Sequence, residues 1–152
     1  MRDDSGCRDL ENFLHAQIPI TREMGVAVEE SSQTRLVLTA PLELNHNHLG
    51  TAFGGSLSAI ATLAGYGLLW NLLDDPRLHI VIRESSMRYL RPVKGEIRAI
   101  CAAPEESAIS SFRTALADRG KARISLRVTV EEEGEICMDF TGEYVALGEG
   151  RK

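Results

Sequence analysis

The sequence predicts an α+β domain in which one antiparallel sheet of five or six strands wraps around one long buried helix. From residue 56 to about residue 73 the side chains are apolar on nearly every side of a helical wheel, and a helix that is hydrophobic all round must be buried all round. Several other segments alternate apolar and polar residues with the period of two that indicates half-buried strands. In a chain of 152 residues, a sheet is the structure that can surround such a helix.

The segments before the long helix are expected to form a short helix and a hairpin. Asp9 is a suitable cap for the short helix, and Pro19 is a suitable end. One side of this helix carries Leu10, Phe13, Leu14 and Gln17. Two runs of alternating apolar residues follow, separated by a polar turn at residues 30–33; they are Met24, Val26 and Val28, and then Leu36, Leu38, Ala40 and Leu42.

Strands dominate the second half of the chain and are expected to be connected mainly by hairpins. The sequence Asp-Asp-Pro at 74–76 ends the long helix, and a helix opened by Pro104 and ended by Gly120 interrupts the strands. Glu133 and Gly134 form a suitable hairpin turn. The four predicted strands cover residues 79–92, 96–103, 124–130 and 136–144.

Composition and charge limit the compartment and the partners. The chain is expected to be a single domain over residues 1–152, with flexible tails at 1–8 and 148–152. A formal net charge of −5 and the lack of a basic stripe argue against a nucleic-acid partner. Three widely spaced cysteines argue against a disulfide framework and suit a reducing compartment. The polar N-terminus does not resemble a signal peptide, and the apolar run at 57–73 contains polar residues, so we expect a cytoplasmic protein that does not bind a membrane.

A pair of glycines, Gly54 and Gly55, stands where the long helix is expected to begin. The first amide groups of a helix have no partner inside it, and the helix dipole is positive there. Because glycine has no side chain, the carbonyl oxygen of a ligand can approach this backbone closely. An amide that stabilises a developing oxyanion lowers the activation barrier by about 3–4 kcal/mol. The alternative interpretation is a plain structural junction between a loop and a helix.

Two motifs flank the helix and resemble those of the hotdog-fold acyl-thioesterase superfamily. The first, N-x-x-G-T-x-F-G-G, covers residues 47–55, and the second, M-R-Y-L-R-P-V-x-G, covers residues 87–95. The version H-N-H-L-G-T-A-F-G-G-S-L at 46–57 is similar to a putative-thioesterase family that also occurs as the C-terminal domain of some GNAT-type acetyltransferases. The resemblance covers roughly residues 20–147. It implies a hotdog fold and hydrolysis of acyl-CoA or acyl-carrier-protein thioesters without a metal or a bound cofactor.

The resemblance also implies roles for individual residues. In related thioesterases the first glycine of the pair donates its N–H to the thioester, and the loop asparagine orients the water or the carbonyl; by match these are Gly54 and Asn47. The candidates for binding substrate beside them are Gly55, Phe53 and Ser56. Two positions depart from the pattern: the usual loop histidine is Phe53, and the usual catalytic carboxylate, seven residues after the second glycine, is Thr62.

The nearest candidate to replace the missing helix carboxylate is Glu84, on the following predicted strand. We expect a water held by Asn47, Thr62 and Ser85 to attack the thioester, with Glu84 as the possible general base. Strand alternation places Ser85 on the helix-facing side and Glu84 on the opposite face, unless a bulge intervenes. Glu84 would then act at a site built at a dimer interface. For Thr62, a hydrogen bond back to its own helix is an equally good interpretation.

Two arginines of the second motif, Arg88 and Arg91, suit the phosphates of a CoA or carrier-protein arm, because guanidinium groups bind phosphate in a forked geometry. They suit solvated strand ends equally well. His46 and His48 lie two residues apart with no third ligand in view, so no metal site is expected. Tyr89 is expected in the core.

The first functional hypothesis is a thioesterase, and the second is a non-catalytic module that binds acyl thioesters. The lack of any carboxylate in residues 56–71 favours the second. A dehydratase or hydratase of the same fold is a weaker alternative, because the catalytic histidine and acid that it needs at the helix are not found. A sheet with an open edge and a cleft needs cover, so we expect a homodimer or a dimer of dimers with acyl sites between subunits, as the resemblance also implies.

Overall fold

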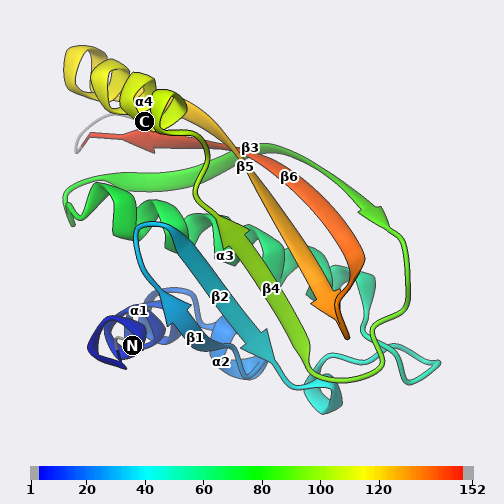
Figure 1. Ribbon diagram of the computed structural model, residues 1–152. Helices are drawn as coiled ribbons and strands as arrows, with labels where there is room; N and C mark the ends of the chain where they lie inside the picture. Colours follow the sequence, from blue (N-terminus) through cyan, green and yellow to red (C-terminus); the bar gives the residue numbers. More distant parts are fainter. Residues whose placement is uncertain (1–3, 149–152) are drawn as a thin grey trace.

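A six-stranded antiparallel sheet wraps around helix α3 in the computed structural model, which describes residues 4–148 (Figure 1). The strands lie in the order β1-β2-β4-β5-β6-β3, which confirms the predicted α+β architecture with six strands. The strands are β1 (Ala27–Ser31), β2 (Arg35–Ala40), β3 (His79–Tyr89), β4 (Ile97–Ala102), β5 (Lys121–Glu132) and β6 (Glu135–Leu147). The helices are α1 (Asp4–Gln17), α2 (Ile20–Glu23), α3 (Gly54–Leu73) and α4 (Glu106–Arg119), with a 3-10 turn, η1 (Leu42–Leu44).

The central helix α3 is buried because its side chains are apolar on most sides. It packs against all of β2 to β6, and its fully buried side chains include Ile60, Ala61, Ala64, Leu68 and Leu69. The length and hydropathy of α3 would suit a membrane span, but more than half of that segment is buried inside the protein, as is typical of a core helix. The helix begins two residues earlier than predicted and ends as predicted, with Asp74 in the left-handed conformation after its last turn.

The strands of the second half show the predicted alternation. In β5, Ile124, Leu126 and Val128 point into the core, while the residues between them are exposed. The opposing side chains of β6, which include Phe140, lie on the same buried side. The turn between the two strands uses positive φ angles at residues 133 and 134, as the Glu-Gly pair predicts. This alternation is why the sheet has one face on α3 and one face in solvent.

The connection from β3 to β4 corrects the expectation that the strands are connected mainly by hairpins. β3 pairs with β6 at one edge of the sheet, whereas β4 lies between β2 and β5. The segment at 90–96 therefore crosses from one edge to the middle of the sheet, rather than turning back on its own strand. Only β1–β2 and β5–β6 are hairpins within the described residues. Periodicity identifies strands, but it carries no information on which strands become neighbours.

The N-terminal segment is more ordered than predicted. Helix α1 begins at Asp4, five residues before the predicted cap Asp9, and Cys7 lies in the core. Residues 4–8, expected to belong to a flexible tail, therefore form the first turns of a helix. At the other end, Gly148 donates its backbone N–H to the carbonyl oxygen of Gly120 at 2.9 Å. The rest of the two predicted tails, 1–3 and 149–152, lies outside the described residues.

The two edges of the sheet differ in how they are covered. Helix α1 lies along the β1 edge, where Glu11 accepts a 2.8 Å hydrogen bond from the backbone N–H of Val28, and His15 bonds the carbonyl oxygen of Val26 at 2.7 Å. At the opposite edge, β3 runs for eleven residues, nearly all of them exposed. No other segment of residues 4–148 pairs with its outer side. The sheet therefore has one closed edge and one open edge.

Candidate functional site

The first turn of α3 presents three backbone N–H groups without a protein acceptor. Within residues 4–148, the amides of Gly54, Gly55 and Ser56 make no hydrogen bond, and no side chain caps the helix. The amide of Leu57 is the first with a partner, the carbonyl oxygen of Phe53 at 3.0 Å. Gly55 is exposed, and its two neighbours are half-buried. The end of a buried helix is thus accessible to a ligand, with its positive dipole facing outward.

Asn45 holds the loop that delivers the chain to this helix end. Its carbonyl oxygen accepts a 2.7 Å bond from the N–H of Phe53, and its side-chain amide donates to the carbonyl oxygens of Met24 and Pro41 at 2.9 and 2.8 Å. Its Oδ1 atom is buried and has no partner among the described residues. Sequence reasoning assigned Asn45 no site role, because a buried asparagine in a polar loop cannot be told from an exposed one by pattern.

Asn47 is occupied by its own loop. Its Oδ1 accepts hydrogen bonds from the backbone N–H of Leu49 at 2.8 Å and of Thr51 at 3.2 Å. Its Nδ2 donates to the Thr51 hydroxyl at 2.9 Å and lies 3.5 Å from the carbonyl oxygen of Ala52. Such an asparagine-centred turn fixes the loop conformation. The predicted part of Asn47 in orienting water or substrate stays a prediction.

Two aromatic rings flank the open helix end. The Phe53 ring lies against Gly55, so closely that a Cβ there would meet its Cε2 atom at 2.4 Å. The Tyr89 ring covers Gly54, and its hydroxyl donates to the Gly54 carbonyl oxygen at 3.2 Å. Phe53 is 55% exposed and Tyr89 53% exposed. The expectation that Tyr89 belongs to the core is therefore wrong: it is the last residue of an edge strand, where no neighbouring strand covers it.

Thr62 lies two turns further along α3, and it is half-buried. Its hydroxyl donates a 2.8 Å hydrogen bond to the carbonyl oxygen of Ser58, as the alternative interpretation of this residue has it. Its own carbonyl oxygen accepts the phenol of Tyr144 at 2.7 Å. A hydroxyl that donates in this way keeps its lone pairs, so Thr62 remains able to accept a hydrogen bond from water.

Ser85 and Glu84 are neighbours in β3 but lie on opposite faces of the sheet. Ser85 lies opposite the buried Gly142 and therefore on the side of α3, whereas Glu84 lies opposite Glu143 on the outer face. The pairing shifts between Ile82 and Glu84, which makes Arg83 the extra residue of a bulge. The bulge does not turn Glu84 inward. Within one chain, the helix end and the candidate base are on opposite faces of the sheet.

The two candidate phosphate-binding arginines are also separated from the helix end. Arg88 lies opposite Asp139 on the outer face of the sheet. Arg91, beyond the end of β3, forms a 2.9 Å ion pair with Glu135, and both side chains are more than half exposed. Among residues 4–148, neither arginine forms a hydrogen bond with the glycine pair. Their predicted contacts with a phosphate arm stay a prediction.

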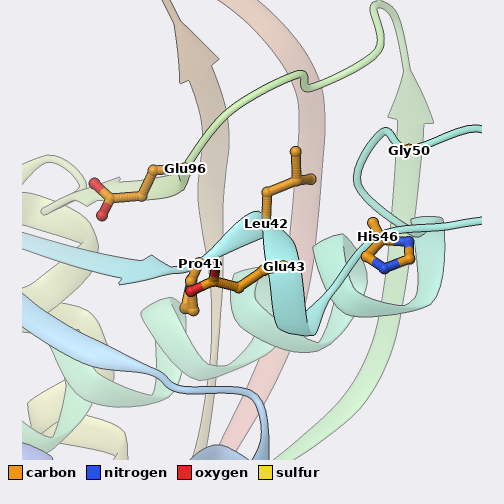
Figure 2. A pocket seen from close by; sticks show the side chains of 6 residues that line it. All are labelled: Pro41, Leu42, Glu43, His46, Gly50 and Glu96. Atoms are coloured by element: carbon orange, nitrogen blue, oxygen red, sulfur yellow. The ribbon is translucent and has the colours of Figure 1, made fainter.

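Other nucleophiles and ligands are poorly placed for chemistry. Burial raises the pKa of the Cys101 thiol to about 12, so this cysteine stays protonated and unreactive at neutral pH. Among residues 4–148, no group of three or more His, Cys, Asp and Glu side chains suits a metal ion. An open groove of about 510 Å³ borders the loop before α3 and is lined by Pro41, Leu42, Glu43, His46, Gly50 and Glu96 (Figure 2). None of the predicted site residues lines this groove.

The fold and the open helix end define the class: a hotdog-fold protein whose central helix presents free amides at its start. A family model described as "Putative thioesterase (yiiD_Cterm)" matches residues 7–148. The chain therefore belongs to this thioesterase family, as the two sequence motifs predicted.

Solved structures of similar proteins agree with this assignment. A protein of unknown function from Chlorobaculum tepidum TLS is 35% identical, with a TM-score of 0.89 over 97% of this chain and 98% of that chain. A putative thioesterase from Shewanella oneidensis is 30% identical, with a TM-score of 0.84 over 95% of this chain and 99% of that chain. A probable thioesterase from Pseudomonas aeruginosa is 26% identical, with a TM-score of 0.82 over 93% and 95%.

Proposed function

We propose that this protein hydrolyses acyl thioesters of CoA or of an acyl carrier protein, and that backbone amides at the start of α3 hold the thioester carbonyl. The observation that carries the proposal is the row of N–H groups at Gly54, Gly55 and Ser56, which have no acceptor within residues 4–148. An amide aimed at a developing oxyanion lowers the barrier by about 3–4 kcal/mol. Membership in a thioesterase family supports the same chemistry.

Water is the nucleophile in this reaction. Its oxygen bonds to the carbonyl carbon, the carbon–sulfur bond breaks, and one proton of the water passes to the departing thiolate. The other proton leaves to solvent from the carboxylic acid that forms. Ser85 and Thr62 are the hydroxyls on the α3 side of the sheet that we assign to holding this water. We assign Asn47 to shaping the loop, because its side-chain amide is bonded there.

In this proposal, no carboxylate beside the helix end acts as the general base. Glu84 faces away from α3 in its own chain and lies 3.7 Å from Arg83 in an exposed ion pair. We therefore assign the rate enhancement to the amides and not to a carboxylate base. The rate is then expected to rise with hydroxide concentration, and Glu84→Gln is expected to leave turnover nearly unchanged.

We further propose that two copies pair through β3 to form a homodimer, on which a dimer of dimers can build. The strand is long, open along its outer side and rich in exposed apolar side chains, which include Val81 and Ile82. Antiparallel pairing about Ser86 places Glu84 opposite Arg88 of the partner subunit, which is a favourable cross-strand pair. Pairing about Glu84 would place two carboxylates together.

The same pairing extends the site across the dimer. Because Arg83 is the extra residue of the bulge, Ile82 of the partner subunit falls opposite Tyr89 on the inner face of the joined sheet. Tyr89 covers Gly54, so an acyl chain beside the helix end would meet an apolar wall from the second subunit. The proposed acyl site therefore lies between subunits.

We propose the cytoplasm as the compartment of this protein, and its thiols support this proposal. Cys7, Cys101 and Cys137 are all unpaired and buried. Unpaired cysteines are typical of a reducing compartment, which supports the cytoplasm as the place of this reaction.

A matched pair of substitutions at Gly54 tests the role of the amides. Gly54 is the first helical residue, where proline is tolerated, and Phe53 before it is already extended at φ −68° and ψ 133°. Gly54→Pro removes the N–H, whereas Gly54→Ala keeps it, and a Cβ at this position meets Tyr89 only at an ordinary 3.5 Å. We expect Gly54→Pro to lower kcat on acyl-CoA by roughly 10²–10³-fold and Gly54→Ala to change it far less. Equal rates for the two variants would contradict the proposal.

The second candidate function is a module that binds acyl thioesters without turning them over. The orientation of Glu84 favours it, because Glu84 faces away from α3 in its own chain. The helix α3 itself contains no carboxylate that could act as the base. Release of free thiol from a series of acyl-CoAs discriminates the two functions. Saturable binding by calorimetry with no thiol released would select the binding module.

A further inference from the structure

A second cavity, remote from the helix end, is surrounded by basic side chains. It has a volume of about 620 Å³, and its lining residues come from the end of α4, the beginning of β5, and strands β3 and β6. Its cationic residues are Arg83, Arg119, Lys121 and Arg123. A cavity of this size lies within the range of small-molecule sites, about 300–1,000 Å³.

Within residues 4–148, carboxylates neutralise only part of the positive charge of this cavity. Glu143 lies 3.1 Å from Arg83 and 3.6 Å from Arg123, and Glu84 lies 3.7 Å from Arg83, so two carboxylates accompany these two guanidinium groups. Arg119 and Lys121 form no ion pair with any carboxylate of the described residues. The protein as a whole carries a net charge of −5, so this local excess of cations opposes the overall charge.

Backbone geometry brings Arg119 and Lys121 to the same rim. They flank Gly120, whose left-handed φ of 69° ends α4 and starts β5 in a single residue. The short turn keeps both side chains beside the cavity that they line. The remaining lining residues, Ala115, Ala122 and Val145, are small or apolar and leave room for the body of a ligand.

We propose that this cavity binds a nucleoside phosphate, with its phosphates between the four cations and its base against the small apolar side chains. Guanidinium groups suit this class of ligand because their forked donors match phosphate oxygens in pairs. The cavity is on the outer face of the sheet, so side-by-side pairing of β3 strands leaves it open. ADP binding can be tested independently of the proposed function, because the helix end lies on the other face.

Binding of ADP, inorganic pyrophosphate and adenosine, measured by calorimetry at about 0.15 M salt, tests the proposal. We expect ADP to bind most tightly, pyrophosphate more weakly and neutral adenosine least. The Arg119→Gln/Lys121→Gln double variant should weaken ADP binding about tenfold or more, and Arg119→Lys/Lys121→Arg should retain it. The matched control is Lys94→Gln/Arg8→Gln, which removes two exposed charges elsewhere and should have less than about a twofold effect.

Two sources of the nucleoside phosphate are separated by a second measurement. Wild type is compared with Arg119→Gln/Lys121→Gln. For each protein, the affinity for an acyl-CoA is divided by the affinity for the same acyl group on pantetheine, which lacks the nucleotide. A ratio that collapses toward one identifies the nucleotide end of CoA as the occupant, and an unchanged ratio with lost ADP binding identifies a separate nucleotide. The proposal is overturned if ADP does not bind saturably, or if the control double variant loses as much affinity.

Discussion

The phenol of Tyr144 donates a 2.7 Å hydrogen bond to the backbone carbonyl oxygen of Thr62 in the middle of α3. The two residues come from the last strand and the central helix, so this bond ties the sheet to the helix that carries the candidate site. Gly65 makes it possible: a Cβ at this position would meet the Tyr144 hydroxyl at 2.2 Å. Burial also raises the pKa of Tyr144, which keeps the phenol protonated as a donor.

Gly65→Ala is therefore expected to destabilise the protein strongly. The added methyl group must displace Tyr144, and overpacking of this kind costs about 1–3 kcal/mol in addition to the lost hydrogen bond of about 1 kcal/mol. Gly67→Ala is a matched control on the same helix, because its Cβ would meet only side-chain atoms of Leu10 and Leu36 at 3.1–3.3 Å. Urea unfolding measures both. Equal losses of stability would show that the Tyr144 contact is not what requires glycine at residue 65.

A charge reversal tests the proposed pairing of β3. Glu84→Arg would place two arginines opposite each other across the dimer, so we expect a dissociation constant raised about tenfold. Adding Arg88→Glu restores opposite charges and should recover most of the affinity. Sedimentation velocity over a range of protein concentrations measures the effect. Glu96→Arg, an exposed reversal away from β3, is the control. A double variant no better than Glu84→Arg would argue against pairing about Ser86.

The buried thiol of Cys101 predicts a loss of stability in alkaline solution. Its pKa is raised to about 12 by burial, from an ordinary value of 9 in the unfolded chain. The folded state therefore keeps a proton that the unfolded state releases, so this stabilisation is fully present below pH 9 and is lost as pH rises toward 12. The slope is about 1.4 kcal/mol per pH unit for this one group. Urea unfolding of Cys101→Ala between pH 9 and 11 should show a shallower slope than wild type; parallel slopes would contradict the assignment.

Several features of the fold followed from local pattern. The all-round apolar character of α3 required burial, and the alternation of apolar and polar residues in β5 defined which of its faces points inward. The same alternation placed Ser85 and Glu84 on opposite faces, which the pairing of β3 with β6 bears out. These inferences succeed because burial of one face depends on residues only a few positions apart.

Other features of the site depend on contacts between distant residues. The exposure of Tyr89 results from the position of β3 at the edge of the sheet, which is decided by its pairing with a strand about fifty residues later. The buried position of Asn45 depends on carbonyl groups of Met24 and Pro41. The basic cavity joins Arg83 to the α4–β5 turn. None of these contacts leaves a periodic signal in the chain.

The sequence by itself determined that a long apolar helix lies inside an antiparallel sheet, and that two glycines stand at the start of that helix, because hydrophobic period and backbone freedom are local properties. Tertiary structure alone decided that the helix end is open, that Tyr89 lies exposed beside it, and that one sheet edge is covered while the other is free. Strand order brings those groups together or keeps them apart, and strand order is set by packing of the whole chain.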